Sequence, residues 1–296
     1  MTDTQNEVFK TPVNKIRLFE HGAPGSQNLK LTRKYYTEDM PDGRVKHIVQ
    51  NITDPDIVPY IPDGIGNSTD RQRIPAVLII PGGAFRRLVY NFEGEDVAKW
   101  LNSMGIAAFV LECRLPSDEH DNAEDVPLID AMRAMRVIRG RAQEFGIDEA
   151  KIGVMGFSAG GFMAALLSTA YESDVYADYK YKDEYDKLSA RPDFAVCSYP
   201  VISIDDCIEA GKRYMSEEQV LERISDGKAK ILHKYNPDKL VRPDMPPVFI
   251  CETDDDRTTL SENSVGFYMA ARKAGVSAEL HIFRTCLLYT SPSPRD

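Results

Sequence analysis

The chain lacks the features that would tie it to a membrane or to a nucleic acid. None of its apolar runs approaches the roughly 20 residues that cross a bilayer, and residues 1–7 have neither the basic nor the apolar region of a signal peptide. Acidic residues outnumber basic ones by 46 to 36, which gives a formal net charge of −10. This charge disfavours nucleic acids and anionic membrane surfaces as partners. We therefore expect a cytoplasmic protein that binds neither, and the sequence leaves its oligomeric state open.

Cysteine and histidine are also scarce, with five of each among 296 residues. Cys113, Cys197 and Cys251 fall in or beside apolar runs without the paired spacing of a metal site, and Cys207 is isolated. We expect these thiols to be reduced and structural. Since the sequence has no His/Cys cluster and no phosphate-binding glycine loop, we expect no metal and no organic cofactor.

The pattern that is present indicates one large domain, which we place at residues 1–285. Hydrophobic residues make up 43% of the chain and charged residues 28%, as in an ordinary globular enzyme. From residue 76 onward, apolar runs of strand character alternate with helical patterns, which predicts an α/β fold with a mostly parallel sheet and helices on both faces. One helix has an apolar face formed by Leu128, Ala131, Met132, Met135, Ile138, Ala142 and Phe145. Within residues 1–73, three runs predict antiparallel strands at one edge of the sheet, at residues 15–19, 31–36 and 46–52.

Two segments interrupt this alternation, and we interpret them as insertions that shape a substrate pocket. Residues 171–190 carry five tyrosines among charged residues, and we expect them near the sheet edge, where aromatic rings can stack on sugars. The alternative is a surface loop whose tyrosines pack locally, which is the better description for most of these rings. Residues 204–245 include Ser216-Glu217-Glu218-Gln219, a capping-box pattern that opens a helix. We predict a small helical cap for this second segment.

The segment Gly156-Phe157-Ser158-Ala159-Gly160 carries the clearest chemical signal. An apolar run precedes it and a helical pattern follows it, so Ser158 is predicted to lie on a sharp turn from strand to helix. The glycines two positions to either side let the backbone turn without a clash. Such a turn lifts the hydroxyl above the sheet edge, and the helix start adds unpaired N–H groups and a positive dipole end. Ser158 is therefore the candidate nucleophile.

Two other strand-like runs end in sequences that suit the same chemistry. The run at residues 76–80 ends in Pro81-Gly82-Gly83-Ala84-Phe85, which can offer backbone N–H groups to a ligand but alone also fits a simple turn. The run at residues 247–251 is followed shortly by three consecutive aspartates at 254–256. A carboxylate at the end of a late strand can orient a catalytic histidine. The alternative is an acidic loop that caps the following helix.

Together these motifs resemble those of compact α/β-hydrolase esterases related to the prolyl-oligopeptidase superfamily, especially acetyl-xylan-esterase-like and other sugar-acetyl esterases. The resemblance covers roughly residues 74–285. It implies an α/β-hydrolase fold with a small helical cap insertion. The matching stretches are residues 81–85, 148–161, 235–241, 245–249, 255–256, 262–264 and 272–283.

The resemblance also implies which groups hold the negative charge of the reaction. The oxyanion hole would consist of the N–H groups of Gly83, Ala84 and Ala159. In this chain Pro81 stands where the family usually has histidine, and Ala84 replaces the third glycine. Because the donors belong to the main chain, neither change removes them.

The triad acid is implied by the family register, which favours Asp255 over Asp256 and disfavours Asp254. The histidine partner cannot be assigned in the same way, because the chain departs from the family pattern where the histidine is expected. Family members continue after the strand at residues 279–283 into a loop that carries it. Residues 286–296 of this chain instead resemble the in-frame translation of an adaptor used in shotgun DNA libraries. We expect them to be non-native, and the natural histidine to lie beyond Thr285. No catalytic histidine is assigned within this chain, whose histidines are His21, His47, His120, His233 and His281.

These features predict a serine carboxylic-ester hydrolase that removes short acyl groups, such as acetyl, from carbohydrate or small-molecule esters through an acyl-enzyme. One alternative is a peptidase or amidase on the same scaffold, since prolyl-oligopeptidase relatives use an arginine where this chain has Arg257. The other is a non-catalytic binding module that keeps the fold, which the intact serine and oxyanion motifs disfavour.

Overall fold

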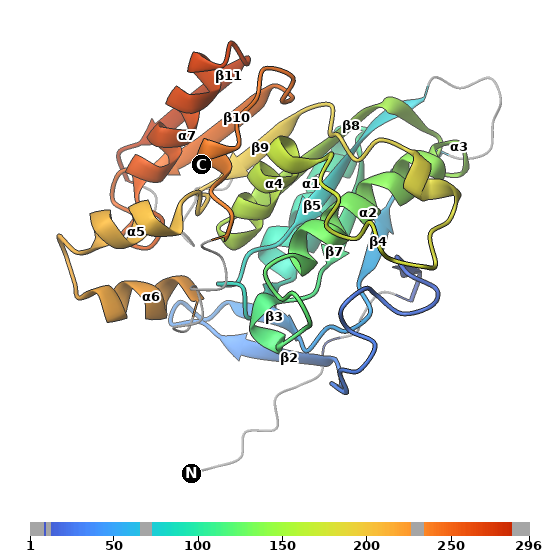
Figure 1. Ribbon diagram of the computed structural model, residues 1–296, viewed down its shortest axis with the longest axis horizontal. Helices are drawn as coiled ribbons and strands as arrows, with labels where there is room; N and C mark the ends of the chain where they lie inside the picture. The colour runs from blue at the N-terminus through green and yellow to red at the C-terminus, as the bar shows by residue number, and fades with distance from the viewer. Residues whose placement is uncertain (1–8, 10–12, 66–72, 226–233, 286–296) are drawn as a thin grey trace.

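An open sheet of eight strands forms the centre of the protein (Figure 1). The computed structural model describes residues 9, 13–65, 73–225 and 234–285. The strand order is β1-β4-β7-β5-β8-β9-β10-β11. The six strands β7, β5, β8, β9, β10 and β11 are all parallel to one another. Strand β4 pairs antiparallel with β7, and β1 pairs antiparallel with β4. The strands are β1 (Ile16–Arg17), β4 (Asp56–Tyr60), β5 (Ile74–Ile80), β7 (Ala107–Glu112), β8 (Ile147–Phe157), β9 (Ala195–Ser198), β10 (Val248–Thr253) and β11 (Ala278–Phe283).

The central strands are buried on both faces, which explains their unbroken apolar sequence. All six residues of β7 are buried, and so are the last five of β5. A strand with one solvated face would instead alternate apolar and polar residues. The uninterrupted run that ends at Ile80 therefore places the glycine-rich motif at the end of a central strand.

A second sheet of three strands differs from the sequence prediction. Strand β3 (Val45–Gln50) lies in the middle of it and pairs with β2 (Lys34–Asp39) on one side and with the two-residue strand β6 (Leu88–Val89) on the other. We expected all the strands of residues 1–73 at one edge of the main sheet, but only β1 and β4 lie there. The reason is that β6, which follows the glycine-rich motif, offers β3 a pairing edge that a local pattern does not reveal.

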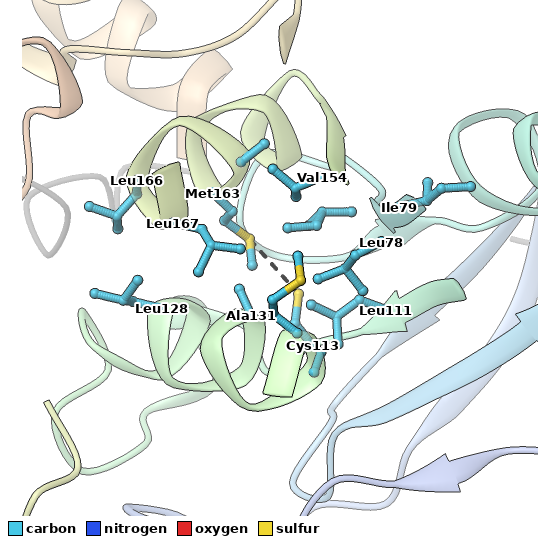
Figure 2. Packing of buried hydrophobic residues seen from close by; sticks show 14 of the residues in the cluster. Leu78, Ile79, Leu111, Cys113, Leu128, Ala131, Val154, Met163, Leu166 and Leu167 are labelled. Atoms are coloured by element: carbon cyan, nitrogen blue, oxygen red, sulfur yellow. Dashed lines mark hydrogen bonds between the residues drawn. The ribbon is translucent and has the colours of Figure 1, made fainter. Parts of the chain in front are cut away.

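The helices pack as their apolar faces require. Helices α2 (Val126–Gly140) and α4 (Ala159–Ala170) contact each other and the sheet, while α1 (Asp96–Ser103) packs on β7 and β4. Figure 2 shows side chains of α2 and α4 meeting those of the strands, and the Sγ atom of Cys113 lies 3.9 Å from the Sδ atom of Met163. All seven residues of the predicted helical face are buried, although the helix breaks after Gly140 and continues as α3 (Ala142–Phe145). None of the helices in the described part of the chain combines the length and the apolar character that a membrane span requires.

The tyrosine-rich segment 171–190 lies away from the sheet edge that carries Ser158, so our prediction that it shapes the pocket is wrong. Arg139, at the end of α2, donates to the carbonyl groups of Ser189 and of Glu149, which lies near the start of β8. Helix α4 runs antiparallel to the strands, and the chain therefore leaves it at the opposite edge. Most of the tyrosines contact other parts of the protein, so the alternative of local packing is also wrong for them: the Tyr179 hydroxyl donates to the Gly22 carbonyl at 2.9 Å, and the Tyr171 hydroxyl donates to Asp244 Oδ2 at 2.7 Å. The Tyr176 hydroxyl bonds to Arg136 on α2 and to Asp186 within the segment.

The segment 204–245 does form helices. They are α5 (Ile204–Gly211) and α6 (Glu217–Ser225), which contact each other and stand at the left of Figure 1. The predicted capping box is present: the Ser216 amide donates to Gln219 Oε1 at 2.9 Å, and the Gln219 amide donates to Ser216 Oγ at 3.2 Å. Helix α5 also contacts α7 (Ser261–Lys273), which packs on β10 and β11.

Candidate active site

The topology brings the candidate residues to one edge of the sheet. Strands β5, β8, β9 and β10 are consecutive and parallel, so their carboxyl ends lie side by side. The glycine-rich motif follows β5, Ser158 follows β8, Tyr199 follows β9, and the three aspartates follow β10. This edge is where ligands bind in open α/β sheets.

Ser158 lies on the sharp turn that the sequence predicts, between the end of β8 and the start of α4. Its backbone has φ 53° and ψ −117°, a strained conformation for a residue with a side chain. Hydrogen bonds hold it there: its amide donates to the Ser198 carbonyl at 3.0 Å, and its carbonyl accepts from Phe162 N at 3.1 Å. The strain is therefore supported by β9 on one side and by the first turn of α4 on the other.

Both flanking glycines are required by close backbone approach. A β-carbon on Gly156 would lie 2.0 Å from the Gly160 carbonyl oxygen, and one on Gly160 would lie 2.0 Å from the Ile80 carbonyl oxygen. Real β-carbons do not come this close to backbone atoms. The two glycines thus let the serine turn pack directly against the end of β5.

The glycine-rich loop lies against the serine. A β-carbon on Gly82 would be 3.0 Å from the Ser158 β-carbon. The next residues have positive φ angles, 142° at Gly83 and 57° at Ala84, which turn the loop outward. Both are partly accessible, and within the described residues the N–H groups of Gly83, Ala84 and Ala159 have no protein acceptor. These are the donors that the sequence assigned to the oxyanion hole.

A buried carboxyl group that the sequence analysis missed supports this loop. Glu93 is 3% exposed and lies in a π-helical turn, Asn91–Glu95. Its Oε2 atom accepts from the Gly82 amide at 2.7 Å, and its Oε1 atom accepts from the Tyr199 hydroxyl at 3.1 Å. Burial raises the pKa of Glu93 to about 7. The sequence offers no local signal for this role, because the partners are 11 and 106 residues away.

The three aspartates after β10 have different surroundings. Asp256 is buried, and its carboxylate accepts from the amides of Thr258 at 2.6 Å and Thr259 at 3.1 Å and from the Thr259 hydroxyl at 3.0 Å. Asp254 is exposed, and its amide donates to the Phe283 carbonyl at 2.8 Å. Asp255 is half-buried between them. Asp256 therefore holds the conformation of its own loop. Helix α7 has no side-chain cap, so the alternative that this acidic run caps the following helix is wrong.

The comparisons with known proteins agree with this geometry. A family model described as BD-FAE matches residues 65–270. This chain belongs to the BD-FAE family. An acetylxylan esterase of Xylanibacter ruminicola is 30% identical over 210 residues, which are 70% of this chain and 39% of that protein. Endo-1,4-β-xylanase B of Butyrivibrio fibrisolvens is 31% identical over 215 residues, which are 72% of this chain and 32% of that protein. The chain therefore spans less than half the length of these two relatives.

Solved structures confirm the α/β-hydrolase fold of this BD-FAE member. An acetyl ester-xyloside bifunctional hydrolase from Caldicellulosiruptor lactoaceticus is similar, with a TM-score of 0.65 and 34% identity over 92% of this chain and 86% of that one. The esterase Est2 from Thermogutta terrifontis has a TM-score of 0.61 at 23% identity over 89% and 83% of the two chains, a likeness of fold alone.

The described histidines of this BD-FAE member contact other parts of the molecule. The ring of His21 meets Tyr181, that of His47 stacks on Phe9, and His120 bonds to the Ser26 hydroxyl at 3.0 Å. His281 lies on β11 and bonds to Glu279. His233 lies outside the described residues. The described part of the chain therefore places no histidine against Ser158.

In the described part of the chain, one hollow lies beside the aspartate loop and another borders Ala159 of the candidate site. The larger, about 610 Å³, lies between the helical segment and the loop after β10, and its lining includes Tyr214, Glu218 and Arg257 but not Ser158. The smaller, about 10 Å³, is bordered by Gly82 and Ala159. The helical segment thus faces the aspartate loop, in agreement with a cap.

Proposed function

We propose that this BD-FAE member is a serine carboxylic-ester hydrolase that removes short acyl groups, foremost acetyl, from carbohydrate esters. The observation that carries the proposal is the placement of Ser158 on a strained turn beside Gly82, near the N–H groups of Gly83 and Ala84, which have no acceptor among the described residues. Among similar proteins, an acetylxylan esterase and an acetyl ester-xyloside hydrolase support sugar acetates as the substrate class.

In the proposed reaction, a base takes the hydroxyl proton of Ser158 while its Oγ atom bonds to the ester carbonyl carbon. The carbonyl oxygen becomes negative and accepts hydrogen bonds from the N–H groups of Gly83, Ala84 and Ala159. The tetrahedral intermediate then breaks the bond to the alcohol oxygen, which leaves with the proton from the base. Water, activated by the same base, attacks the acyl-enzyme and releases the acid and the free serine.

We propose that the base is a histidine beyond Thr285 in the natural protein, oriented by Asp255. Two observations support this assignment. The four described histidines contact residues remote from Ser158. The carboxylate of Asp256 already accepts from three donors of its own loop, and the family register favours Asp255, which is half-buried just after the end of β10.

The preference for short acyl groups is supported by the space around the oxyanion donors. The hollow bordered by Gly82 and Ala159 has a volume of about 10 Å³, and Phe85, Leu115 and Met163 are among the side chains that line it. That is room for about one water molecule. A hollow this small favours a short acyl group over a long chain beside Ala159.

The test uses the protein with its natural sequence after Thr285. Acetate release from acetylated xylo-oligosaccharides is measured beside hydrolysis of p-nitrophenyl acetate and octanoate. We expect a higher kcat/KM for the acetyl ester, and a loss on the order of 10⁴-fold in Ser158→Ala. A preference for octanoate together with inert sugar acetates would contradict the carbohydrate-ester proposal. Turnover unchanged in Ser158→Ala would contradict the serine mechanism.

A peptidase or amidase activity is the second candidate, favoured by the position of Arg257. Its side chain borders the larger hollow beside the aspartate loop, where it can meet a substrate carbonyl or carboxylate. The same preparations should be assayed with aminoacyl p-nitroanilides. Cleavage of these amides without hydrolysis of acetyl esters would replace the esterase proposal with this one.

A further inference from the structure

Glu93 connects the two backbone segments that flank the serine strand. Its two carboxyl oxygens accept from Gly82, which follows β5, and from Tyr199, which follows β9. Strand β8, which ends at Ser158, lies between those two strands. The carboxyl group of Glu93 therefore bridges the neighbours of the serine strand at the edge where the proposed reaction takes place.

The π-helical turn that carries Glu93 packs against the sheet and so holds the Glu93 side chain in place. A β-carbon on Gly94 would lie 2.9 Å from Val110 on β7 and 3.4 Å from Pro81, so the turn sits directly on the sheet beside the glycine-rich loop. π-helical turns are often found at functional sites. Tyr199 is held as well, because its amide donates to the Cys251 carbonyl at 2.7 Å. Gly82 and Tyr199, the two residues that Glu93 joins, are therefore held at the ends of β5 and β9.

Because Glu93 occupies one N–H group of the glycine-rich loop, it determines which of the loop's N–H groups remain available to a substrate. Pro81 has no N–H group, and the Gly82 N–H is taken by Glu93. The Gly82 carbonyl accepts from Val89 N at 2.9 Å, and the Gly83 carbonyl accepts from the amide of Arg87 at 3.3 Å. With those groups occupied, the next two amides, of Gly83 and Ala84, have no acceptor within the described residues. If the Gly82 peptide rotated after losing its bond to Glu93, the N–H groups of Gly83 and Ala84 would change direction with it.

We propose that Glu93 is a positioning residue of the oxyanion hole: by accepting the Gly82 N–H and the Tyr199 hydroxyl, it directs the amides of Gly83 and Ala84 toward the carbonyl oxygen of the substrate. This inference rests on the proposed function. Glu93 itself does not touch the substrate. Glu93 affects the position of the Gly83 and Ala84 amides, which bind the carbonyl oxygen most strongly when it becomes negative in the transition state. Loss of Glu93 should therefore lower kcat more than it changes KM.

The test compares variants that keep or remove the acceptor, in the protein with its natural sequence after Thr285. Glu93→Gln keeps an acceptor for the Gly82 amide, and Glu93→Leu has a similar size without one. Tyr199→Phe removes the other half of the bridge. Tyr179→Phe is its matched control, because the Tyr179 hydroxyl donates to the Gly22 carbonyl at 2.9 Å, in the segment that lies away from the Ser158 edge. For each protein, kcat and KM for p-nitrophenyl acetate are measured with the thermal midpoint and the exchange rate of the Gly82 amide.

In Glu93→Leu we expect kcat to fall by about 10- to 100-fold with KM within about threefold, since loss of one whole oxyanion donor costs about 10²- to 10³-fold. Glu93→Gln should stay within about fivefold of the wild type, Tyr199→Phe should lose about three- to tenfold in kcat, and Tyr179→Phe should match the wild type. The Gly82 amide should exchange faster in Glu93→Leu than in Glu93→Gln.

Several results would overturn the positioning role. They are a folded Glu93→Leu with wild-type kcat, a glutamine variant as impaired as the leucine variant, or a change confined to KM. If Glu93→Leu does not fold, an unchanged kcat in Tyr199→Phe overturns it. A wild-type protein without ester turnover would instead count against the proposed function, and the exchange rate of Gly82 would still decide whether Glu93 holds this amide.

Discussion

Gly160 faces the carbonyl oxygen of Ile80 so closely that a β-carbon on the glycine would lie 2.0 Å from it. Gly160 is the second residue of the helix after Ser158, and Ile80 ends the strand before the glycine-rich loop. This contact therefore sets how close the candidate nucleophile stands to the candidate oxyanion donors.

The contact predicts opposite effects for two helical glycines. Gly160→Ala should lower the free energy of unfolding by about 3 kcal/mol or more, because the new methyl group overlaps backbone that cannot move aside. Gly266→Ala should raise it by about 0.5–1 kcal/mol, because Gly266 lies exposed in α7 with nothing within 4 Å of an added β-carbon. Urea denaturation of both variants measures this difference. Equal stabilities would show that the serine turn does not pack as described.

The two buried or half-buried aspartates after β10 should separate activity from stability. Asp255→Asn should reduce kcat on the order of 10³- to 10⁴-fold, since it removes the charge that we propose orients the histidine. Asp256→Ala leaves the amides of Thr258 and Thr259 without their acceptor and should lower the free energy of unfolding by about 1–3 kcal/mol. Kinetics and urea denaturation on the same samples check both. The reverse pattern would make Asp256 the triad acid.

Glu252 predicts a dependence of stability on pH. Burial raises the pKa of this 1% exposed carboxyl to about 9, helped by nearby Asp256, from an ordinary value of 4.5. The folded protein keeps the proton that the unfolded chain releases, so stability falls as the pH rises from 4.5 to about 9. Glu252→Gln removes this one-proton contribution, which is about 1.4 kcal/mol per pH unit within that window. Unfolding free energies at several pH values test it, and parallel slopes for the two proteins would contradict it.

The placement of the histidines predicts the activity of the chain as printed. Without a base at Ser158, residual catalysis in triad enzymes is only about 10³- to 10⁴-fold over water. Residues 1–296 should therefore be nearly inactive, and the natural sequence after Thr285 should restore turnover. It should also improve solubility, because Phe249 and Phe283, on either side of His281, are 37% and 54% exposed on β10 and β11. If both forms are equally active and soluble, His281 or another described histidine must be reconsidered as the base.

The parts of the site that the sequence could predict are those encoded locally. The apolar strand, the glycines and the helix around Ser158 are consecutive, and each follows from a steric rule. The same holds for the capping box at Ser216 and for the apolar face of α2. The family resemblance, in turn, predicted the α/β-hydrolase fold, which the solved structures confirm.

What the sequence could not predict depends on contacts between distant segments. Glu93 and Tyr199 are 106 residues apart, and nothing near either residue indicates the partner. The strand pattern at residues 46–52 is correct as a strand but does not say that β6 is its neighbour. From the sequence we predicted residues 171–190 at the wrong edge of the sheet, because amino-acid composition does not show in which direction the preceding helix, α4, runs.

The most direct test of the central claim is covalent trapping of the nucleophile. The protein with its natural sequence after Thr285 is treated with diethyl p-nitrophenyl phosphate, and the released p-nitrophenolate, the remaining ester hydrolysis and the modified peptide are measured together. We predict one diethylphosphoryl group per chain, attached to Ser158, with activity lost in proportion to labelling and neither effect in Ser158→Ala. Labelling at another residue in step with the loss of activity, or full activity with Ser158 labelled, would contradict the account.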